Sequence, residues 1–155
     1  VQPDVVTTAK GLGNGMPIGA CLAHGEAATL MQPGNHGSTF GGNPLASAVA
    51  LKVVELIESG DIYQRAVKVG NIIMQGLTDA LEGVRHVKDI RGCGCMIGIE
   101  LNQPCKSLYT EALKHGLVVN VTADSVIRLL PPMIMTDQEA QQVVNILAPL
   151  IKDFQ

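Results

Sequence analysis

The stretch "TTAKGLGNGMPIGA" (residues 7–20) places one lysine, Lys10, between an apolar segment and a run of alternating glycines. The β-branched residues at 4–9 predict a strand that ends at these glycines, and residues 18–24 predict a second short, buried strand. Lys10 is the only charged residue in the stretch. It is therefore either a reactive amine or the solvated end of a strand.

Two common phosphate-binding motifs do not fit this stretch. A P-loop has its lysine after the glycines, whereas Lys10 precedes them, and a dinucleotide fingerprint needs glycine where Met16 stands. The alternating glycines instead indicate a backbone that bends sharply or leaves space beside the lysine. A lysine that forms a Schiff base with an aldehyde cofactor also needs a phosphate anchor and an acid at the pyridine nitrogen. Asp4 lies roughly 20 Å away along an extended strand, so that acid must come from elsewhere.

Composition restricts the class of protein. The chain has 155 residues, of which 46% are hydrophobic and 16% charged, as in a globular protein with a substantial core. The net charge is −3, the basic residues are scattered and aromatic residues make up 3%, which argues against a nucleic-acid surface. No apolar stretch approaches the roughly 18 residues of a membrane helix, so we expect no membrane partner.

Four cysteines occur without a signal peptide, which favours a reducing, cytoplasmic location. Cys93 and Cys95 form a C-x-C that could belong to a zinc site. No second close pair of Cys or His accompanies it, so we favour small residues in a turn that enters a strand and expect no metal.

The rest of the chain predicts helices followed by a mixed layer. A loop at 32–44 leads to a helix that Asn43 caps, Pro44 begins and Gly60 ends. The predicted elements after it are a helix at 61–81, strands at 84–90 and 95–101 joined by a turn at 91–94, a helix at 104–116, strands at 117–122 and 125–132, and a final helix at 136–154. Thr136 and Glu139 form a capping box at the start of that helix. The second half is thus an α+β layer with helices on one face of a sheet.

The beginning of the chain favours a fragment of a longer protein. It lacks an initiator Met, and the first two predicted strands cannot form a stable sheet alone.

Four segments resemble one known family. "PDVVTTAKGLGNGMPIGA" and "HGSTFGGNPLASAVA" resemble two signatures of the class III (subgroup II) pyridoxal-phosphate aminotransferases, and "IRGCGCMIGIEL" and "VNVTADSVIRLLPP" continue the likeness in the same order. The four segments are spread over residues 3–132, which is most of the chain. The resemblance implies an α/β and α+β fold that is the C-terminal part of a fold type I pyridoxal-phosphate transferase. Residues 1–60 would end the large cofactor-binding domain, and residues 61–155 would form the small C-terminal domain.

The resemblance also implies roles for four residues. Lys10 would be the catalytic lysine that binds pyridoxal 5'-phosphate, Thr39 would hold the cofactor phosphate across a homodimer with shared sites, and Ser38 would lie near the substrate. Arg128 would bind a substrate carboxylate, for which its planar guanidinium is suited. The residues alone leave alternatives open. Ser38 and Thr39 could be an incidental pair in a surface loop, and Arg128 could face outward on an alternating strand.

The implied activity is transamination between N-acetylornithine and 2-oxoglutarate in arginine biosynthesis. The alternatives are another ω-amino acid aminotransferase, acting on ornithine or succinylornithine, and a non-catalytic truncated domain without cofactor. The family's main phosphate loop, its stacking aromatic residue and its acid at the pyridine nitrogen would all precede Val1. We therefore expect activity of the parent protein and little of this chain alone.

Overall fold

The computed structural model describes residues 1–154, and these divide into two compact units. Unit 1 is Val1–Gly60 and unit 2 is Asp61–Gln155. Each unit is considered by itself below. No helix among the described residues has the length and apolarity that a membrane crossing needs.

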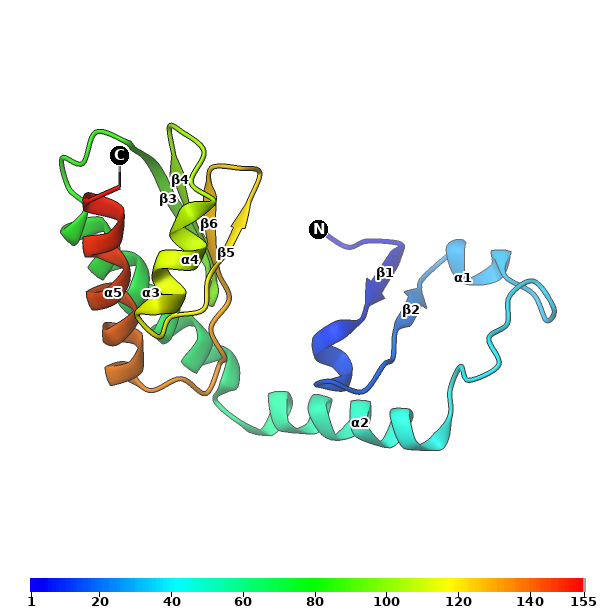
Figure 1. The fold of residues 1–155 in the computed structure, drawn as a ribbon. Coiled ribbons are helices and arrows are strands. Elements are labelled where there is room, and N and C mark those ends of the chain that lie inside the picture. Colours follow the sequence, from blue (N-terminus) through cyan, green and yellow to red (C-terminus); the bar gives the residue numbers. More distant parts are fainter. Residues whose placement is uncertain (155) are drawn as a thin grey trace. The chain divides into compact units, whose positions relative to one another are not determined.

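Unit 1 consists of a small hairpin followed by helices (Figure 1). Strand β1 (Val5–Thr8) pairs antiparallel with β2 (Ala20–Ala23). The connection between them contains a short 3₁₀ helix, η1 (Lys10–Gly13), and the helices α1 (Ala27–Leu30) and α2 (Pro44–Ser59) follow. The strand before Lys10 and the strand after the glycines thus form as predicted.

The prediction that the second strand is buried is wrong. All four residues of β2 are exposed, because β1 and β2 pair only with each other and α2 packs on η1. A two-stranded ribbon buries little surface without a covering layer.

Helix α2 begins and ends as the sequence predicts. The Asn43 side chain accepts a hydrogen bond from the Ala46 N–H at 3.0 Å, and Pro44 occupies the first turn. Such a cap satisfies one of the N–H groups that have no partner inside the helix. The helix contributes only two buried residues, the small side chains Ala46 and Ala50. Most of its large apolar side chains are exposed, namely Leu45, Leu51, Val54, Leu56 and Ile57.

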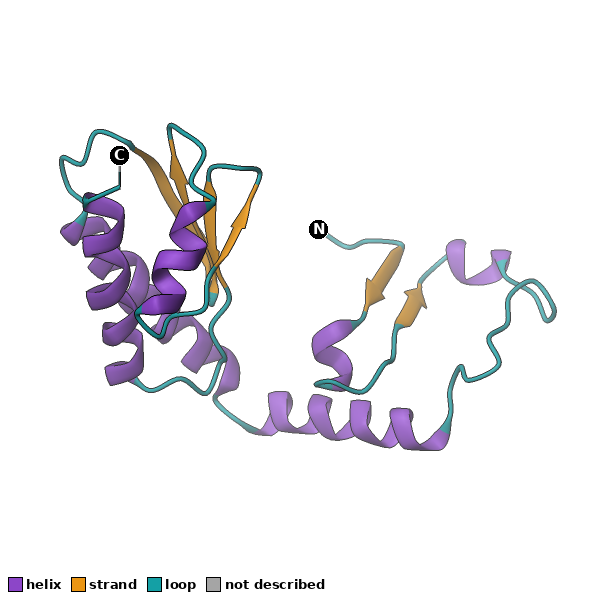
Figure 2. Ribbon diagram, viewed as in Figure 1, coloured by secondary structure: helices purple, strands orange, loops and turns teal. Residues whose placement is uncertain are grey.

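Unit 2 is a four-stranded antiparallel sheet with helices on one face, as predicted (Figure 2). The strand order is β3-β4-β6-β5. The strands are β3 (Val87–Cys93), β4 (Met96–Leu101), β5 (Asn120–Thr122) and β6 (Val126–Leu129). The helices are α3 (Ile62–Ala80), α4 (Ser107–Lys114) and α5 (Asp137–Lys152).

The core of unit 2 lies between the sheet and these helices. Alternate residues of β4 and β6 point into it, and the predicted face of α3 meets them. The most deeply buried side chains include Ile97, Ile99, Ile127, Ile73 and Leu77. The capping box of α5 is present: Thr136 Oγ1 accepts from the Glu139 N–H, and the Glu139 carboxylate accepts from the Thr136 N–H.

The predicted turn at 91–94 is displaced. Strand β3 continues through Arg91 to Cys93, which pairs with Met96, so the hairpin turns at Gly94 and Cys95. Gly94 has φ +54°, a left-handed conformation that suits a tight hairpin turn. A Cβ at Gly70 of α3 would lie 2.0 Å from the Gly94 carbonyl oxygen, so helix and turn approach at a distance that glycine permits.

Candidate functional site

Lys10 lies where β1 ends and η1 begins. Its side chain is exposed, and its backbone has φ +52°, the left-handed region that residues with a Cβ seldom adopt. Ala9 before it is extended, and its carbonyl accepts a hydrogen bond from the Leu12 N–H at 3.1 Å. The chain therefore turns abruptly at the lysine itself. Backbone conformations of this kind cluster at functional sites, where surrounding structure maintains them.

The glycines after Lys10 have different roles. Nothing lies within 4 Å of a Cβ placed on Gly11, so the space next to the lysine is open. Gly15 has φ +106°, which a side chain would strain. Gly13 is buried, and a Cβ there would meet the Ile18 side chain at 2.8 Å. The sequence interpretation of a sharp bend and of space beside the lysine is thus confirmed at Gly15 and Gly11, and Gly13 adds a packing role.

The loop before α2 carries Ser38 and Thr39, and both are exposed. It turns at Gly41, whose N–H donates to the Ser38 carbonyl at 3.1 Å. Asn43 fixes the end of the loop, because its side chain donates to the Phe40 carbonyl at 2.9 Å while it caps α2. The loop is therefore held by hydrogen bonds at its junction with the helix.

A hollow of about 370 Å³ lies between this loop and the end of the glycine-rich stretch. Its lining includes Ser38 and His36 from the loop and Pro17 to Gly19 from the stretch. Lys10 and Thr39 are not among the lining residues. Unit 1 thus brings Ser38 to the glycine-rich stretch but does not place Lys10 and Thr39 in one pocket. The sequence gives no signal for His36 as a lining residue, because the turn-forming residues around it have no periodic pattern.

Arg128 lies on β6 between Ile127 and Leu129, which are both buried. Its own side chain is exposed and lies on the sheet face opposite the helices. Of the two orientations that the sequence left open, the structure shows the outward one. A guanidinium there keeps its hydration, so the cost of burying a charge does not arise.

The outward face around Arg128 is hollowed. The hollow has a volume of about 330 Å³, and its lining includes Arg91, Met96, Gly98 and Thr122 beside Arg128. The strand register explains the set, since Arg91 pairs with Gly98 and Gly98 pairs with Arg128. One row across three strands therefore carries an arginine, a glycine and a second arginine. This row depends on non-local pairing, so the sequence analysis missed Arg91 and Gly98 as members of a site.

Arg91 belongs to an ion-pair network. Its Nη1 lies 2.8 Å from Asp89 Oδ2 and 2.7 Å from Glu100 Oε2, and Lys88 Nζ lies 2.5 Å from Glu100 Oε1. Arg91 donates hydrogen bonds to Asp89 and Glu100, and these raise the pKa of Arg91, with Asp89 as the larger cause. Hydrogen bonds that Lys88 and, second, Arg91 donate to Glu100 lower the pKa of that carboxyl. Arg91 lies within β3, and its ion-pair partners belong to the same β3–β4 hairpin.

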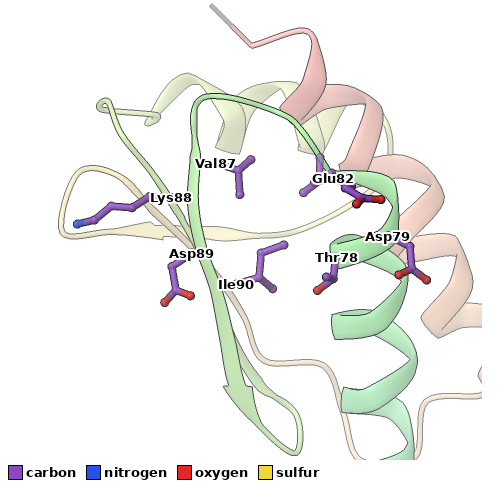
Figure 3. A pocket seen from close by; sticks show the side chains of 8 residues that line it. Thr78, Asp79, Glu82, Val87, Lys88, Asp89 and Ile90 are labelled. Atoms are coloured by element: carbon purple, nitrogen blue, oxygen red, sulfur yellow. The ribbon is translucent and has the colours of Figure 1, made fainter.

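A third depression lies between the end of α3 and β3 (Figure 3). Figure 3 shows Val87 and Ile90 directed towards the helix, whereas Lys88 points away from it. Asp79 and Glu82 on the helix side are acidic. Among residues 1–154, however, no group of three or more His, Cys, Asp or Glu side chains is arranged to hold a metal ion. We therefore assign no metal ion to this depression.

The cysteines of the C-x-C differ in environment. Cys93 is exposed at the end of β3, whereas Cys95 is buried and its thiol donates to the Ala66 carbonyl at 3.6 Å. Burial raises the pKa of the Cys95 thiol, which keeps it in the less reactive protonated form.

Comparison with known proteins identifies the family. The family model Aminotransferase class-III matches residues 1–151. The chain belongs to this family. The resemblance in the four sequence segments is thereby confirmed.

Individual relatives of this class-III chain carry two different names. This chain is 50% identical over 154 residues to acetylornithine aminotransferase 1 of Bordetella parapertussis. The match covers 99% of this chain and 39% of that protein. An ornithine aminotransferase structure from Plasmodium yoelii is 31% identical with a TM-score of 0.92, covering 100% of this chain and 42% of the other. An acetylornithine aminotransferase structure from Elizabethkingia anophelis is 33% identical with a TM-score of 0.89. The match covers 99% of this chain and 40% of the other chain.

These comparisons confirm the predicted fold class. The class-III chain is a mixed α/β structure that matches about 40% of the length of solved aminotransferases. It spans 39% of the curated Bordetella relative.

Class-III aminotransferases use pyridoxal phosphate, and the donor groups of this chain fit parts of that cofactor. Lys10 offers an exposed primary amine beside open space at Gly11, which suits an aldehyde. Thr39 and Ser38 offer exposed hydroxyls in a loop where nothing lies within 4 Å of a Cβ on Gly42, which leaves room for a phosphate. The fit is to two separate ends of the cofactor, since Lys10 and Thr39 do not line one hollow.

Proposed function

We propose that this chain carries the lysine and the carboxylate-binding arginine of an aminotransferase that moves an amino group from N-acetylornithine to 2-oxoglutarate in arginine biosynthesis. The observation that carries the proposal is Lys10, an exposed amine at a left-handed backbone position within the family signature. The substrate is favoured by the name of the 50% identical relative, acetylornithine aminotransferase 1.

In this proposal pyridoxal phosphate, when bound, supplies an aldehyde that accepts the amino group and a ring that delocalises negative charge from the substrate Cα. Lys10 Nζ holds the cofactor aldehyde and carries the proton to and from the substrate Cα. The open space beside the lysine allows its amine to approach and withdraw without a clash. Residues 1–60 belong to the cofactor domain and residues 61–155 form the small domain.

Thr39 and Ser38 serve the anionic and substrate ends of the site. The Thr39 hydroxyl donates to the cofactor phosphate, and Ser38, which lines the loop hollow, lies next to the substrate. As the family resemblance implies, we propose that Thr39 serves the site of a second subunit in a homodimer. Arg128 donates a fork of N–H groups to a substrate carboxylate from the outward face of the sheet.

A second candidate acts on ornithine or succinylornithine. It is favoured by the solved structure with a TM-score of 0.92, which is an ornithine aminotransferase. A third is a truncated domain that binds no cofactor, in which Lys10 is idle. The first two candidates differ in the amino donor that they convert, and the third converts none.

The test is Lys10→Ala in the protein that contains this chain, assayed with 2-oxoglutarate and each amino donor in turn. We expect N-acetylornithine to be preferred, and kcat to fall by at least about 10³-fold in the variant because proton transfer at Cα is lost. The matched control is Lys52→Ala, an exposed lysine on α2 that pairs with Glu55. Ordinary turnover by the Lys10 variant, or equal loss in the Lys52 variant, contradicts the assignment.

A further inference from the structure

The hollow around Arg128 contains a second arginine that the proposed function does not use. Arg91 and Arg128 lie on β3 and β6, one on each side of β4, with Gly98 between them in the same cross-strand row. Neighbouring strands lie about 4.8 Å apart, so the two Cα atoms are roughly 10 Å apart. Arginine side chains are long enough to reach one ligand from both of these positions, and both residues line the hollow.

Gly98 leaves the floor of the hollow open between the arginines. A Cβ at Gly98 would meet only the Val126 side chain at 3.5 Å, which is an ordinary contact. Packing therefore does not require glycine here, in contrast to Gly70 on α3. The missing side chain instead leaves space between two cationic residues.

The two arginines differ in their partners. Arg91 pairs with Asp89 and Glu100, and Lys88 pairs with Glu100, so this cluster of two cations and two anions sums to zero. Arg128 takes part in none of the ion pairs found in residues 1–154. The hollow therefore offers one guanidinium that is free for an anion.

A β-bulge builds this cluster. The β3–β4 register shifts between Val87 and Asp89, and Asp89 then pairs with Glu100. The shift directs Lys88 away from the helices, as Figure 3 shows, so both Lys88 and Asp89 lie on the side of Glu100. Bulges commonly redirect a side chain in this way. The Glu100 side chain is 20% exposed, whereas Lys88 and Arg91 are 64% and 51% exposed, so Glu100 is the least exposed member of the cluster.

We propose that Glu100 is a specificity-determining residue of the carboxylate site. It neutralises the charge of Arg91, whose Nη1 it shares with Asp89, so the hollow binds one carboxylate through Arg128 and does not bind the second carboxylate of a short dicarboxylate. The inference rests on the proposed role of Arg128. Without Glu100, Arg91 keeps only Asp89 and gains the freedom to bind a second carboxylate beside Gly98.

The test compares two probes in the full chain, glutarate and pentanoate, which have the same carbon count and differ by one carboxylate. Dissociation constants from NMR titration at low ionic strength are measured for the wild type and for Glu100→Gln. We expect the variant to bind glutarate roughly 3- to 10-fold more tightly and pentanoate less than about 2-fold more tightly, since a charge-assisted fork forms for the former only.

The matched control is Glu111→Gln on α4, which removes the same charge from an exposed pair with Lys114 at 2.8 Å. It should leave both constants unchanged. The double variant Arg91→Gln/Glu100→Gln should lose the gain for glutarate, and circular dichroism checks that each variant is folded. An equal gain for both probes, the same gain in Glu111→Gln, or no saturable binding in any variant overturns the inference.

Arg128→Gln separates this inference from the proposed function. If Arg128→Gln weakens both probes and Glu100→Gln changes neither, the role of Glu100 fails and that of Arg128 stands. If Arg128→Gln changes neither probe, the carboxylate role of Arg128 fails and the inference fails with it.

Discussion

The two units of this chain differ in how they bury apolar side chains. Unit 2 has a continuous core of 20 buried residues between its sheet and three helices. In unit 1 the buried apolar residues among those described are Ala46 and Ala50, while Val5, Leu22 and most of the large apolar side chains of α2 are exposed. Burial of apolar surface is the main favourable term in folding. Unit 1, which carries the proposed catalytic lysine, is therefore stabilised less by contacts within this chain than unit 2.

The largest expected effect comes from separating the units. Residues 61–155 alone should unfold cooperatively in urea, with a free energy of unfolding of roughly 5–10 kcal/mol. Residues 1–60 alone should show no cooperative transition, because they lack a core. Circular dichroism during a urea titration measures both. A cooperative transition of residues 1–60 would break the comparison.

A matched pair of leucines tests the same difference at single-residue scale. Leu77 of α3 is 0% exposed, and Leu56 of α2 is 48% exposed. Leu77→Ala should lower the free energy of unfolding by about 2–5 kcal/mol, because it removes buried methyl groups and leaves a cavity. Leu56→Ala should cost less than about 1 kcal/mol. Urea midpoints of the full chain decide the matter, and equal losses would mean that α2 is packed as tightly as α3.

The smallest effect is the pH dependence of unit 2. Ion pairs lower the pKa of Glu100, through Lys88 and then Arg91, and that of Asp137, through Lys68 and then Arg65. A lowered pKa in the folded state means that the unfolded state binds more protons on acidification, so stability rises with pH in this range. The contribution should be complete above the ordinary values of 4.5 and 3.8 and disappear as the pH falls through the folded-state values.

Urea midpoints of residues 61–155 between pH 6 and about 2.5 measure this loss. Asp137→Asn should reduce the fall of the urea midpoint at low pH, since the variant has no carboxyl to titrate at this position. A midpoint that rises on acidification through the ordinary carboxyl range would show that these ion pairs do not stabilise the unit.

Sequence prediction succeeded where the signal was local. The Asn43 cap, the Thr136–Glu139 capping box and the apolar face of α3 all follow from residues within a few positions of one another. It failed where the structure depends on contacts between residues that are far apart in the sequence. The alternation of apolar and polar residues along β6 does not indicate which face of the sheet the helices cover. The direction of the Arg128 side chain was therefore left open.

The candidate site shows the same limit. The residues around Lys10 leave it open whether the lysine is reactive or only the solvated end of a strand, and the family resemblance favours a reactive one. The structure adds its left-handed backbone. The row of Arg91, Gly98 and Arg128 requires the register of three strands. The displaced hairpin turn arises because Gly94 and not Arg91 adopts the left-handed conformation that the turn needs.

The account depends most on Lys10 as the lysine that binds the cofactor. The direct measurement is to add pyridoxal phosphate to the protein that contains this chain, reduce with borohydride and map the labelled lysines by mass spectrometry. The account predicts that the label on Lys10 far exceeds that on other exposed lysines such as Lys52. Weak and equal labelling of Lys10 and the other lysines would contradict it.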